Sequence, residues 1–372
     1  MDFRAFRKDS FVSVLLVSVL FGFAAGAVGM LVAFAYALPE QQAVGGVSGT
    51  ARSMALPAED PAPAAELSRG TALFFDKSVM DRAQSGDPLR TLLPSEATGS
   101  GFVLTSDGWI AAHRDSFPKG HRAADAVVSV NGRVYAVRQV VSDTHTDALF
   151  LRVEASGLPV TGFGASDDVI TGGSAFVFDR FGGLHRLSVL AHDDLAVANA
   201  ADLRWSSERL QHVLHLGGAE GVLPGAMVLS RKGEIVGMFA GNDTAGAYAV
   251  PREAFSRALG GILKDGDAHR PYLGVRYMDR TRVISSVAVV RGALLVPSAD
   301  GKQPAVARKS PAEAAGLRDG DVILALDGQD ITANVALADL VAEYSPSDAV
   351  SLTVEREGKV IRVEATFGTM AK

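Results

Sequence analysis

The chain has 372 residues, of which 48% are hydrophobic and 21% are charged, and a formal net charge of −6. This length allows two or three domains, and both fractions are ordinary for globular proteins. The negative charge and the scattered lysines and arginines exclude a nucleic-acid-binding protein, which needs a concentrated basic face. The sequence contains no cysteine, which excludes a disulfide framework, a thiolate zinc site and a cysteine nucleophile.

Residues 11–38 form an uncharged, mostly apolar stretch, longer than the roughly 20 residues that span a bilayer as a helix. Arg4, Arg7 and Lys8 precede this stretch, and the next basic residue after it is Arg52. The positive-inside rule therefore places residues 1–10 in the cytoplasm. We expect a single-pass membrane protein with the bulk of the chain outside the cytoplasm, in the periplasm or the extracellular space.

A cleavable signal peptide is the alternative for the N-terminus. Ala33-Phe34-Ala35 and Ala35-Tyr36-Ala37 both fit a small-x-small cleavage site. The apolar run is too long for a typical signal peptide, which favours an anchor. Gly22 and Gly26 form a GxxxG pair, which fits either a helix–helix contact or ordinary glycines of a membrane helix.

Residues 39–70 are rich in Ala, Pro, Gly and polar residues and have no sustained apolar period, which predicts a flexible linker. From 71 to 266 the chain consists of short β-type runs separated by Gly, Asp and Ser. These runs predict a β-barrel or sandwich. Helical periodicity returns at 252–259, directly after Pro251, and predicts a closing helix. The runs lie at 72–75, 101–104, 126–130, 148–153 and 234–239.

The last hundred residues, 268–372, have a different pattern. Strand-like segments at 294–296, 322–326 and 350–354 surround two candidate helices. These helices are expected at 310–315 and 336–343, and Gly316 stands where a helix C-terminal glycine belongs. The pattern predicts a compact α+β module.

Four ordered segments of the chain carry a resemblance to a known family. The segments are Gly99–Ile110, Thr146–Leu151, Gly164–Asp167 with Gly173–Val177, and Pro224–Val228 with Gly233–Gly237. The family they resemble is the HtrA/Deg proteases, with a chymotrypsin-like double β-barrel. In that family the matching segments are, in turn, the run before the catalytic histidine, the run holding the catalytic aspartate, a G-x-S-D turn with the next strand, and the nucleophile loop with its following hairpin.

Two further segments, Tyr272–Val275 and Ser310–Ile323, resemble a PDZ domain. The resemblance covers nearly everything after residue 70. It implies a mainly β protein with a trypsin-like (chymotrypsin-like double β-barrel) domain over 71–266 and an α+β PDZ domain over 268–372. The apolar run adds an N-terminal transmembrane helix over 11–38.

The positions of the catalytic triad follow from counting along the resembling segments. The base falls on Asp115, and His113 lies two residues early; the orienting carboxylate falls on Asp147 and the nucleophile on Pro224. Proline has neither a hydroxyl to attack with nor an N–H to donate to an oxyanion. Val222 replaces a glycine of the same loop. We therefore expect that no intact catalytic triad is present.

Three alternatives keep some chemistry at this site. His113 could act as a base if the strand bulged, although no serine stands at 224 for it to activate. Ser116 adjoins Asp115, but without an imidazole or lysine beside it a turn residue is the simpler interpretation. Asp115 and Asp147 could share a proton or bind a cation, as paired carboxylates do.

A metal site is the remaining chemical possibility. Asp143, His145 and Asp147 alternate and could share a strand face, whereas His212 and His215 would point to opposite faces of a strand. Such spacings are usually those of solvated loop residues. We predict no metal and no cofactor.

The resemblance to PDZ domains assigns peptide binding to the loop Tyr272, Leu273, Gly274 and Val275. Such a loop holds a peptide's terminal carboxylate with backbone N–H groups while the peptide adds a strand to the sheet. Gly274 permits the close approach of backbone that a carboxylate needs. The simpler reading is that Leu273 and Val275 are core residues of a vestigial groove.

These observations lead to two hypotheses about function. The first is a membrane-anchored HtrA-like pseudoprotease that binds C-terminal or unfolded peptides through its PDZ domain. It would act as a scaffold or regulator in envelope protein quality control, and the family's trimers suggest a homo- or hetero-trimer with HtrA relatives. The second is an active HtrA-type serine endopeptidase that degrades misfolded envelope proteins, which fold alone does not justify.

Overall fold

The fold comes from a computed structural model that describes residues 61–79, 92–117, 121–195, 204–244, 246–282 and 291–370. The expected membrane anchor at 11–38 lies outside the described residues. Within the described ranges, no helix is both long and apolar enough to cross a bilayer.

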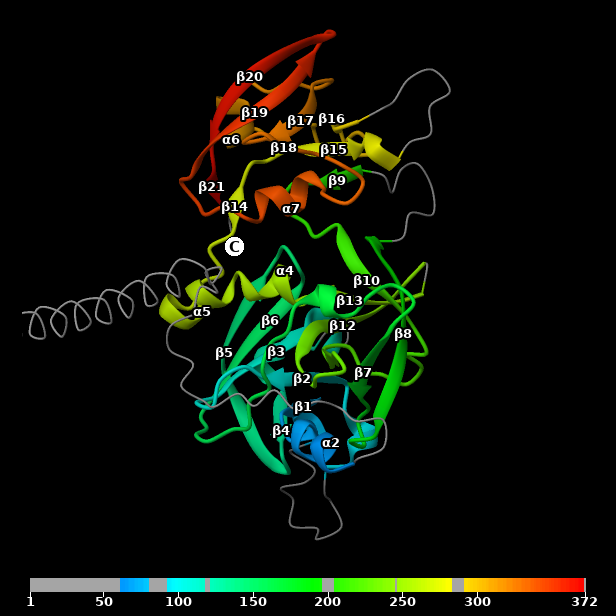
Figure 1. Cartoon of the computed structure of the whole chain (residues 1–372). Coiled ribbons are helices and arrows are strands. Elements are labelled where there is room, and N and C mark those ends of the chain that lie inside the picture. Colours follow the sequence, from blue (N-terminus) through cyan, green and yellow to red (C-terminus); the bar gives the residue numbers. More distant parts are fainter. Residues whose placement is uncertain are drawn as a thin grey trace, which may run out of the picture. The chain divides into compact units, whose positions relative to one another are not determined.

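The first of two closed β-barrels follows the predicted strand runs (Figure 1). Its strands are hydrogen-bonded in the order β1-β2-β3-β6-β5-β4, with all pairs antiparallel. A buried cluster that includes Phe74, Ile110 and Leu151 fills the barrel. The strands are β1 (Thr71–Phe75), β2 (Gly99–Val103), β3 (Trp109–His113), β4 (Val127–Val130), β5 (Arg133–Asp143) and β6 (Ala148–Val153).

The second barrel closes in the order β10-β13-β12-β11-β7-β8. Its own cluster includes Val177, Leu214 and Phe239. A further cluster joins residues of both barrels, among them Phe102 and Met238. The strands are β7 (Ser174–Phe178), β8 (Leu184–Asp194), β10 (His212–Gly217), β11 (Met227–Leu229), β12 (Ile235–Asp243) and β13 (Gly246–Pro251).

The cluster shared by the two barrels explains the continuous apolar runs in the sequence. Every residue of β2 and β3 is buried, because one face of these strands lines the first barrel and the other meets the shared cluster. Phe102 of β2 lies 6.0 Å from Phe255 between ring centroids. A strand buried on both faces loses the alternation of apolar and polar residues, as these do.

The helices around the barrels differ in two places from the sequence prediction. The predicted helix 252–259 is divided into α4 (Arg252–Ser256) and α5 (Leu259–Asp265), which ends at Gly266 with φ +76°. Residues 61–68, assigned to the flexible linker, form helix α2 (Pro61–Ser68), and its Leu67 is 4% exposed in the shared core. The end of the expected linker is therefore packed structure, because Leu67 has an apolar surface to bury.

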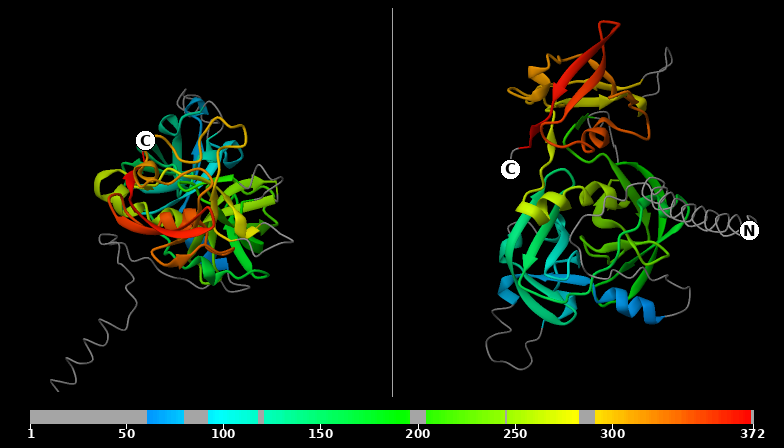
Figure 2. Two further views of the ribbon diagram at one scale, coloured as in Figure 1. Left: turned by 90° about the horizontal axis from the view of Figure 1, so that it is seen from above. Right: turned by 60° about the vertical axis from the view of Figure 1, so that its left-hand side comes forward.

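The C-terminal module, residues 271–370, contains the predicted strands and both predicted helices, shortened at their ends. Its sheet has the strand order β20-β19-β17-β16-β15-β9, with β18 paired to β17, and β14 pairs with β21. Figure 2 shows the long β19–β20 hairpin in red from two further sides. The elements are β14 (Pro271–Tyr272), β15 (Arg276–Asp279), β16 (Ala293–Leu295), α6 (Pro311–Ala314), β17 (Val322–Leu326), β18 (Gln329–Asp330), α7 (Leu337–Val341), β19 (Ala349–Arg356), β20 (Lys359–Thr366) and β21 (Gly368–Thr369).

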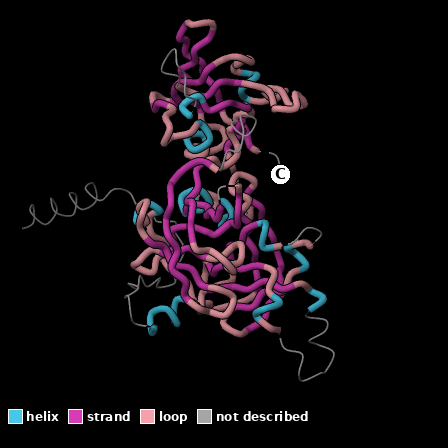
Figure 3. The backbone as a smooth tube through the Cα atoms, turned by 90° about the vertical axis from the view of Figure 1, so that its right-hand side faces the viewer, coloured by secondary structure: helices cyan, strands magenta, loops and turns pink. Residues whose placement is uncertain are grey.

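Local sequence accounts for the ends of α6. The Ser310 side chain accepts a hydrogen bond from the Glu313 N–H and caps the helix. Gly316 follows the last turn with φ +79°, which confirms the predicted helix end. Figure 3 shows that strands are the main regular structure of the described chain, that loops connect them, and that its helices are short.

One strand of the module's sheet comes from outside the module. β9 (Arg204–Ser206) precedes the second barrel's β10 in the chain but pairs antiparallel with β15. Its partners are Arg276↔Ser206, Tyr277↔Trp205 and Met278↔Arg204. The sheet of the C-terminal module is thus completed by a segment that belongs to the barrels in sequence.

A buried ion pair joins the first barrel to the start of the C-terminal module. Arg270 donates two hydrogen bonds to the Asp143 carboxylate, from Nε at 2.9 Å and from Nη2 at 2.6 Å. The Asp143 side chain is 0% exposed and that of Arg270 is 5% exposed. Burial acts to raise the pKa of Asp143, but the charge and hydrogen bonds of Arg270 outweigh it and hold that pKa below its ordinary value.

Replacement of Arg270 by Met should lower the free energy of unfolding by about 3–5 kcal/mol, because it leaves the Asp143 carboxylate buried without a partner. Urea unfolding of the full chain in detergent measures this. Arg138→Met is the matched control: Arg138 pairs with Glu154 at 3.1 Å with both side chains exposed, so its removal should change stability little. Equal effects of the two substitutions would contradict the prediction.

Candidate functional site

His113 and Asp115 lie at the end of β3, where the triad base was expected. The His113 side chain is 3% exposed and that of Asp115 is 58% exposed. His113 Nδ1 accepts a hydrogen bond from the Asp115 backbone N–H at 3.2 Å. Burial lowers the pKa of His113, against the smaller opposing effect of the Asp115 and Asp147 charges. The ring is therefore neutral at pH 7, and its Nδ1 lone pair is bound to the backbone.

Asp147 lies in the turn between β5 and β6 with φ +58°. Its Oδ1 is 2.9 Å from Arg114 Nη1 and its Oδ2 is 2.8 Å from Arg209 Nη2. Each carboxylate oxygen thus faces a guanidinium group. This arrangement gives no support to a dyad with Asp115, since the partners of Asp147 are two arginines.

Pro224 lies in the loop before β11, and its carbonyl group is hydrogen-bonded to β2. That carbonyl accepts hydrogen bonds from the Ser100 N–H at 2.8 Å and from the Ser116 hydroxyl at 2.8 Å. Ser116 is 0% exposed. The hydroxyl of Ser116 is therefore a buried donor to the backbone, which answers the suggestion that it acts as a nucleophile.

Glycine is the only residue type that fits position 225. Gly225 has φ +88°, and a Cβ there would lie 1.9 Å from the Ser100 carbonyl oxygen. Its N–H donates to the Phe239 carbonyl at 2.7 Å. Pro224 has no N–H and that of Gly225 is already bonded, so neither offers a donor to an oxyanion.

Val222 is accommodated without strain. The left-handed conformation of the loop is taken by Gly221, with φ +79°, and by Gly225, whereas Val222 is not among the positive-φ residues. The left-handed backbone angles of this loop therefore fall on glycines, which adopt them readily.

The five residues considered for a metal site have other partners. Asp143 binds Arg270, the His145 ring Nδ1 is 3.0 Å from the Glu208 carbonyl oxygen, and His215 Nε2 is 2.7 Å from the Asp194 carbonyl oxygen. Burial and the charge of Arg270 lower the pKa of His145 to about 4, so its ring is neutral. No group of three His, Asp or Glu side chains in the described part of the chain is arranged to hold a metal ion.

The loop 272–275 of the C-terminal module has both features that the sequence suggested. Leu273 and Val275 are buried core residues at 0% and 1% exposure. Gly274 has φ +85°, and a Cβ there would lie 2.5 Å from the Ser310 Cβ. The N–H groups of Leu273 and Gly274 both donate to Oε1 of Glu208, at 3.1 and 2.8 Å. The loop is thus a backbone nest that holds a carboxylate.

Glu208 is the functional residue that sequence reasoning missed. It is 5% exposed and lies 65 residues from Leu273 in the chain. Nothing in its local sequence distinguishes it from other acidic loop residues. The signal is the contact itself, which only the tertiary structure provides.

Comparisons with known proteins agree with this fold. A sequence model of the PDZ domain matches residues 271–366. The first relative is "Probable periplasmic serine endoprotease DegP-like" of Ectopseudomonas mendocina, which is 26% identical over 319 residues, or 80% of this chain and 61% of the relative. The protein of the same name from Chlamydia trachomatis is 26% identical over 287 residues, or 72% of this chain and 53% of the relative. This chain is similar to HtrA/DegP proteins and contains a PDZ domain.

The structural comparison supports the fold. "HtrA-type protease AlgW with tripeptide" superposes with a TM-score of 0.61 at 19% identity, covering 84% of this chain and 98% of that one. The chain spans only 61% and 53% of the length of the two DegP-like relatives. Their activity is therefore considered under the proposed function.

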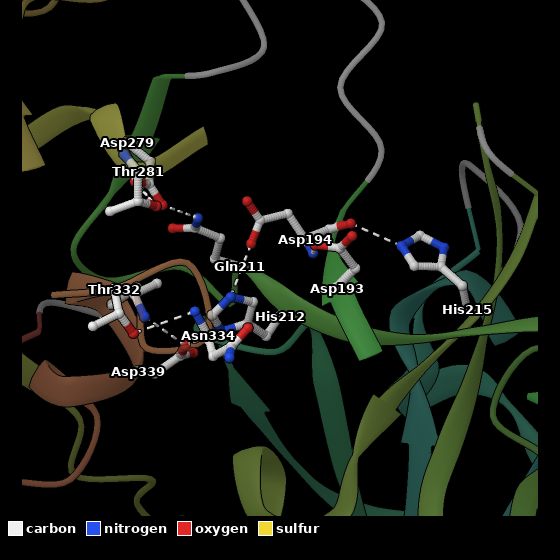
Figure 4. A network of polar contacts seen from close by, with 12 residues as sticks. Asp193, Asp194, Gln211, His212, His215, Asp279, Thr281, Thr332, Asn334 and Asp339 are labelled. Carbon is white, nitrogen blue, oxygen red and sulfur yellow. Dashed lines mark hydrogen bonds and ion pairs between the residues drawn. The ribbon is translucent and has the colours of Figure 1, made fainter. Parts of the chain in front are cut away.

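A charged network joins the second barrel to the PDZ domain (Figure 4). His212 of β10 lies between two carboxylates, with Nε2 3.0 Å from Asp194 Oδ1 and Nδ1 in contact with Asp339 Oδ2 of the PDZ helix α7. Burial acts to lower the pKa of His212, but the hydrogen bonds and charges of Asp194 and Asp339 outweigh it and raise that pKa to about 10. His212 is therefore an imidazolium at neutral pH.

Beside this histidine, Gln211 is fully buried and bridges two PDZ residues. Its Nε2 donates to Asp279 Oδ2 at 3.0 Å, and its Oε1 accepts from the Tyr277 hydroxyl at 2.7 Å. Residues 211 and 212 together fix the end of segment 204–211 against the PDZ domain.

The stability that His212 contributes should depend on pH. Its pKa is raised from 6.5 to about 10 on folding, so the contribution is complete below about pH 6.5 and is lost as the pH rises to about 10. We expect the difference in unfolding free energy between the wild type and His212→Gln to shrink from pH 6 to pH 10, measured by urea unfolding. In an Asp339→Asn background the shrinkage should be smaller. A difference that stays constant with pH would contradict the ion-pair assignment.

Proposed function

We propose that this chain is a membrane-anchored HtrA-like pseudoprotease that acts by binding peptides or proteins in the cell envelope. The observation that carries the proposal is Pro224, at the position where the resemblance to the family puts the nucleophile. A proline there supplies neither the attacking hydroxyl nor an oxyanion donor.

The surroundings of Pro224 support the same proposal. Its carbonyl is bound by Ser100 and Ser116, and the Gly225 N–H is bound by Phe239. The imidazole nearest the expected base position, His113, is buried, and its Nδ1 accepts from the backbone. Hydrolysis at this site would need a new nucleophile, a new base and new oxyanion donors. The loss of a single member of a catalytic triad already lowers the rate by orders of magnitude.

Location and partners belong to the proposal as well. The apolar segment 11–38 would anchor the chain, and the periplasmic DegP-like relatives support an extracytoplasmic location for the rest. The match of residues 271–366 to a PDZ domain supports peptide binding, as do the titles of the AlgW structures, "with decapeptide" and "with tripeptide". We propose C-terminal or unfolded peptides as ligands of the loop 272–275, and a homo- or hetero-trimer with HtrA relatives as the assembly.

An active serine endopeptidase is the second candidate. The names of the DegP-like relatives favour it. It requires a nucleophile other than residue 224, and the two serines that donate to the Pro224 carbonyl, Ser100 and Ser116, are buried.

A serine-directed fluorophosphonate probe and an unfolded casein substrate separate the two candidates. The full chain in detergent should neither label nor cleave casein between pH 3 and pH 8, as judged by gel fluorescence and fragment release. Pro224→Ser should remain unlabelled too, because no imidazole is placed to activate the new hydroxyl. Labelling of the wild type together with cleavage would overturn the pseudoprotease proposal, and cleavage confined to acidic pH would support the carboxylate alternative.

A further inference from the structure

The carboxylate of Glu208 fills the backbone nest of the PDZ domain. Besides the N–H groups of Leu273 and Gly274, it accepts hydrogen bonds from its own segment: Oε2 from the Ser206 hydroxyl at 2.6 Å and Oε1 from the Ser207 hydroxyl at 2.5 Å. A buried carboxylate needs such donors in place of water. The nest cannot offer the same two N–H groups to a second carboxylate at the same time.

The backbone before Glu208 is an added strand of the PDZ sheet. β9 pairs antiparallel with β15, and the next residue, Ser207, continues the ladder with its N–H donating to the Val275 carbonyl at 3.0 Å. The other edge of β15 pairs with β16. Both edges of β15 are therefore occupied.

A PDZ ligand is recognised by these two features together: a strand added to the sheet edge, and a terminal carboxylate held by a loop of N–H groups. Residues 204–208 make both contacts, with a side-chain carboxylate where a ligand would place its α-carboxylate. We propose that residues 204–208 are an internal ligand of the PDZ groove, and that a peptide with a free C-terminal carboxylate binds only by displacing them. This inference rests on the proposed peptide binding by the loop 272–275.

The barrels hold the internal ligand from its other side. The Leu210 N–H donates to the His145 carbonyl at 2.9 Å, and the neutral His145 ring donates from Nδ1 to the Glu208 carbonyl. Arg209 Nη2 lies 2.8 Å from Asp147 Oδ2. These contacts are made with the barrels and not with the PDZ groove. They would therefore hold the segment near the groove even when a peptide displaces it. An intramolecular ligand has a high effective concentration. The apparent affinity for an outside peptide is the intrinsic affinity multiplied by the fraction of molecules in which the groove is empty.

A pocket next to Glu208 gives an approach for the incoming carboxylate. It has a volume of ≈ 650 Å³, and its lining includes Glu208, Tyr272 and three cationic side chains, Arg276, Lys302 and Arg308. Cationic groups around an opening raise the local concentration of an anionic ligand. The competing ligand is thus a peptide with an anionic C-terminus that meets this cationic rim before it reaches the nest.

The test uses the full chain in detergent and a fluorescein-labelled peptide, Asp-Leu-Arg-Phe-Ser-Ser. This is the sequence of residues 202–207 with phenylalanine in place of Trp205, and it ends in a free carboxylate. Anisotropy titrations compare it with its C-terminal amide. Glu208→Ala should bind the free acid about 10- to 100-fold more tightly than the wild type, because it removes a carboxylate bound by two N–H groups.

Two further variants control this measurement. Glu220→Ala removes an exposed glutamate of the second barrel and should leave the affinity unchanged. Glu208→Gln keeps the size of the side chain and should also raise the affinity for the free acid, by a smaller factor than Glu208→Ala. This second variant tests the proposal if Glu208→Ala fails to fold.

Trp205 reports the displacement directly. It packs partly buried against the PDZ core, and the chain's other tryptophan is Trp109 in the barrel core. In a Trp109→Phe chain, the unlabelled peptide should shift the Trp205 emission to longer wavelength as the segment leaves the groove.

The outcomes separate the two claims. Carboxylate-dependent binding with equal affinity in the wild type and Glu208→Ala, or binding without a change in Trp205 emission, would overturn the internal ligand and leave peptide binding intact. No binding of the free acid by any of the folded chains would overturn both, since the peptide copies the segment that occupies the groove.

Discussion

The buried carboxylate of Asp143 is the interaction on which the rest of this structure depends. It has no exposed surface, so its charge is tolerated only with Arg270 held beside it. Arg270 stands between α5 and β14, and the pair therefore fixes the point where the PDZ domain leaves the barrels. The Thr146 hydroxyl and the His145 N–H also donate to this carboxylate, at 2.6 and 3.2 Å, which holds the whole turn after β5 in one conformation.

That turn connects the expected triad position at Asp147 with the loop 272–275 of the PDZ domain. Asp147, at its end, is the carboxylate that the resemblance assigns to the triad, and Arg209 binds it from segment 204–211. His145, inside the turn, binds the carbonyl of Glu208, whose side chain reaches the PDZ nest. Asp147 and the loop 272–275 are thus linked through two neighbouring residues, Glu208 and Arg209. Each makes charge-assisted hydrogen bonds, which are stronger and more directional than neutral ones.

Much of the fold and part of the site follow from the sequence. The strand runs, the closing of α6 at Gly316 and the PDZ loop were all predicted, because each depends on local patterns or on the conformational freedom of one glycine. The equivalence of Pro224 to the nucleophile position came from counting along ordered segments and stays a prediction. The helix α2 was missed because its buried Leu67 acquires its apolar partners only when the barrels are assembled.

What the sequence determined by itself is chemistry that a residue type forbids: a proline cannot attack, and it cannot donate an N–H, wherever the fold puts it. What only the tertiary structure decided is which groups satisfy the donors and acceptors that remain. Ser116 was a possible nucleophile until its hydroxyl was found bonded to the Pro224 carbonyl. The loop 272–275 was expected to bind a carboxylate from another molecule, and the structure fills it with Glu208 of the same chain. The physical reason is that buried polar groups must be paired, and the partner is chosen by position in space, which no local pattern of residues encodes.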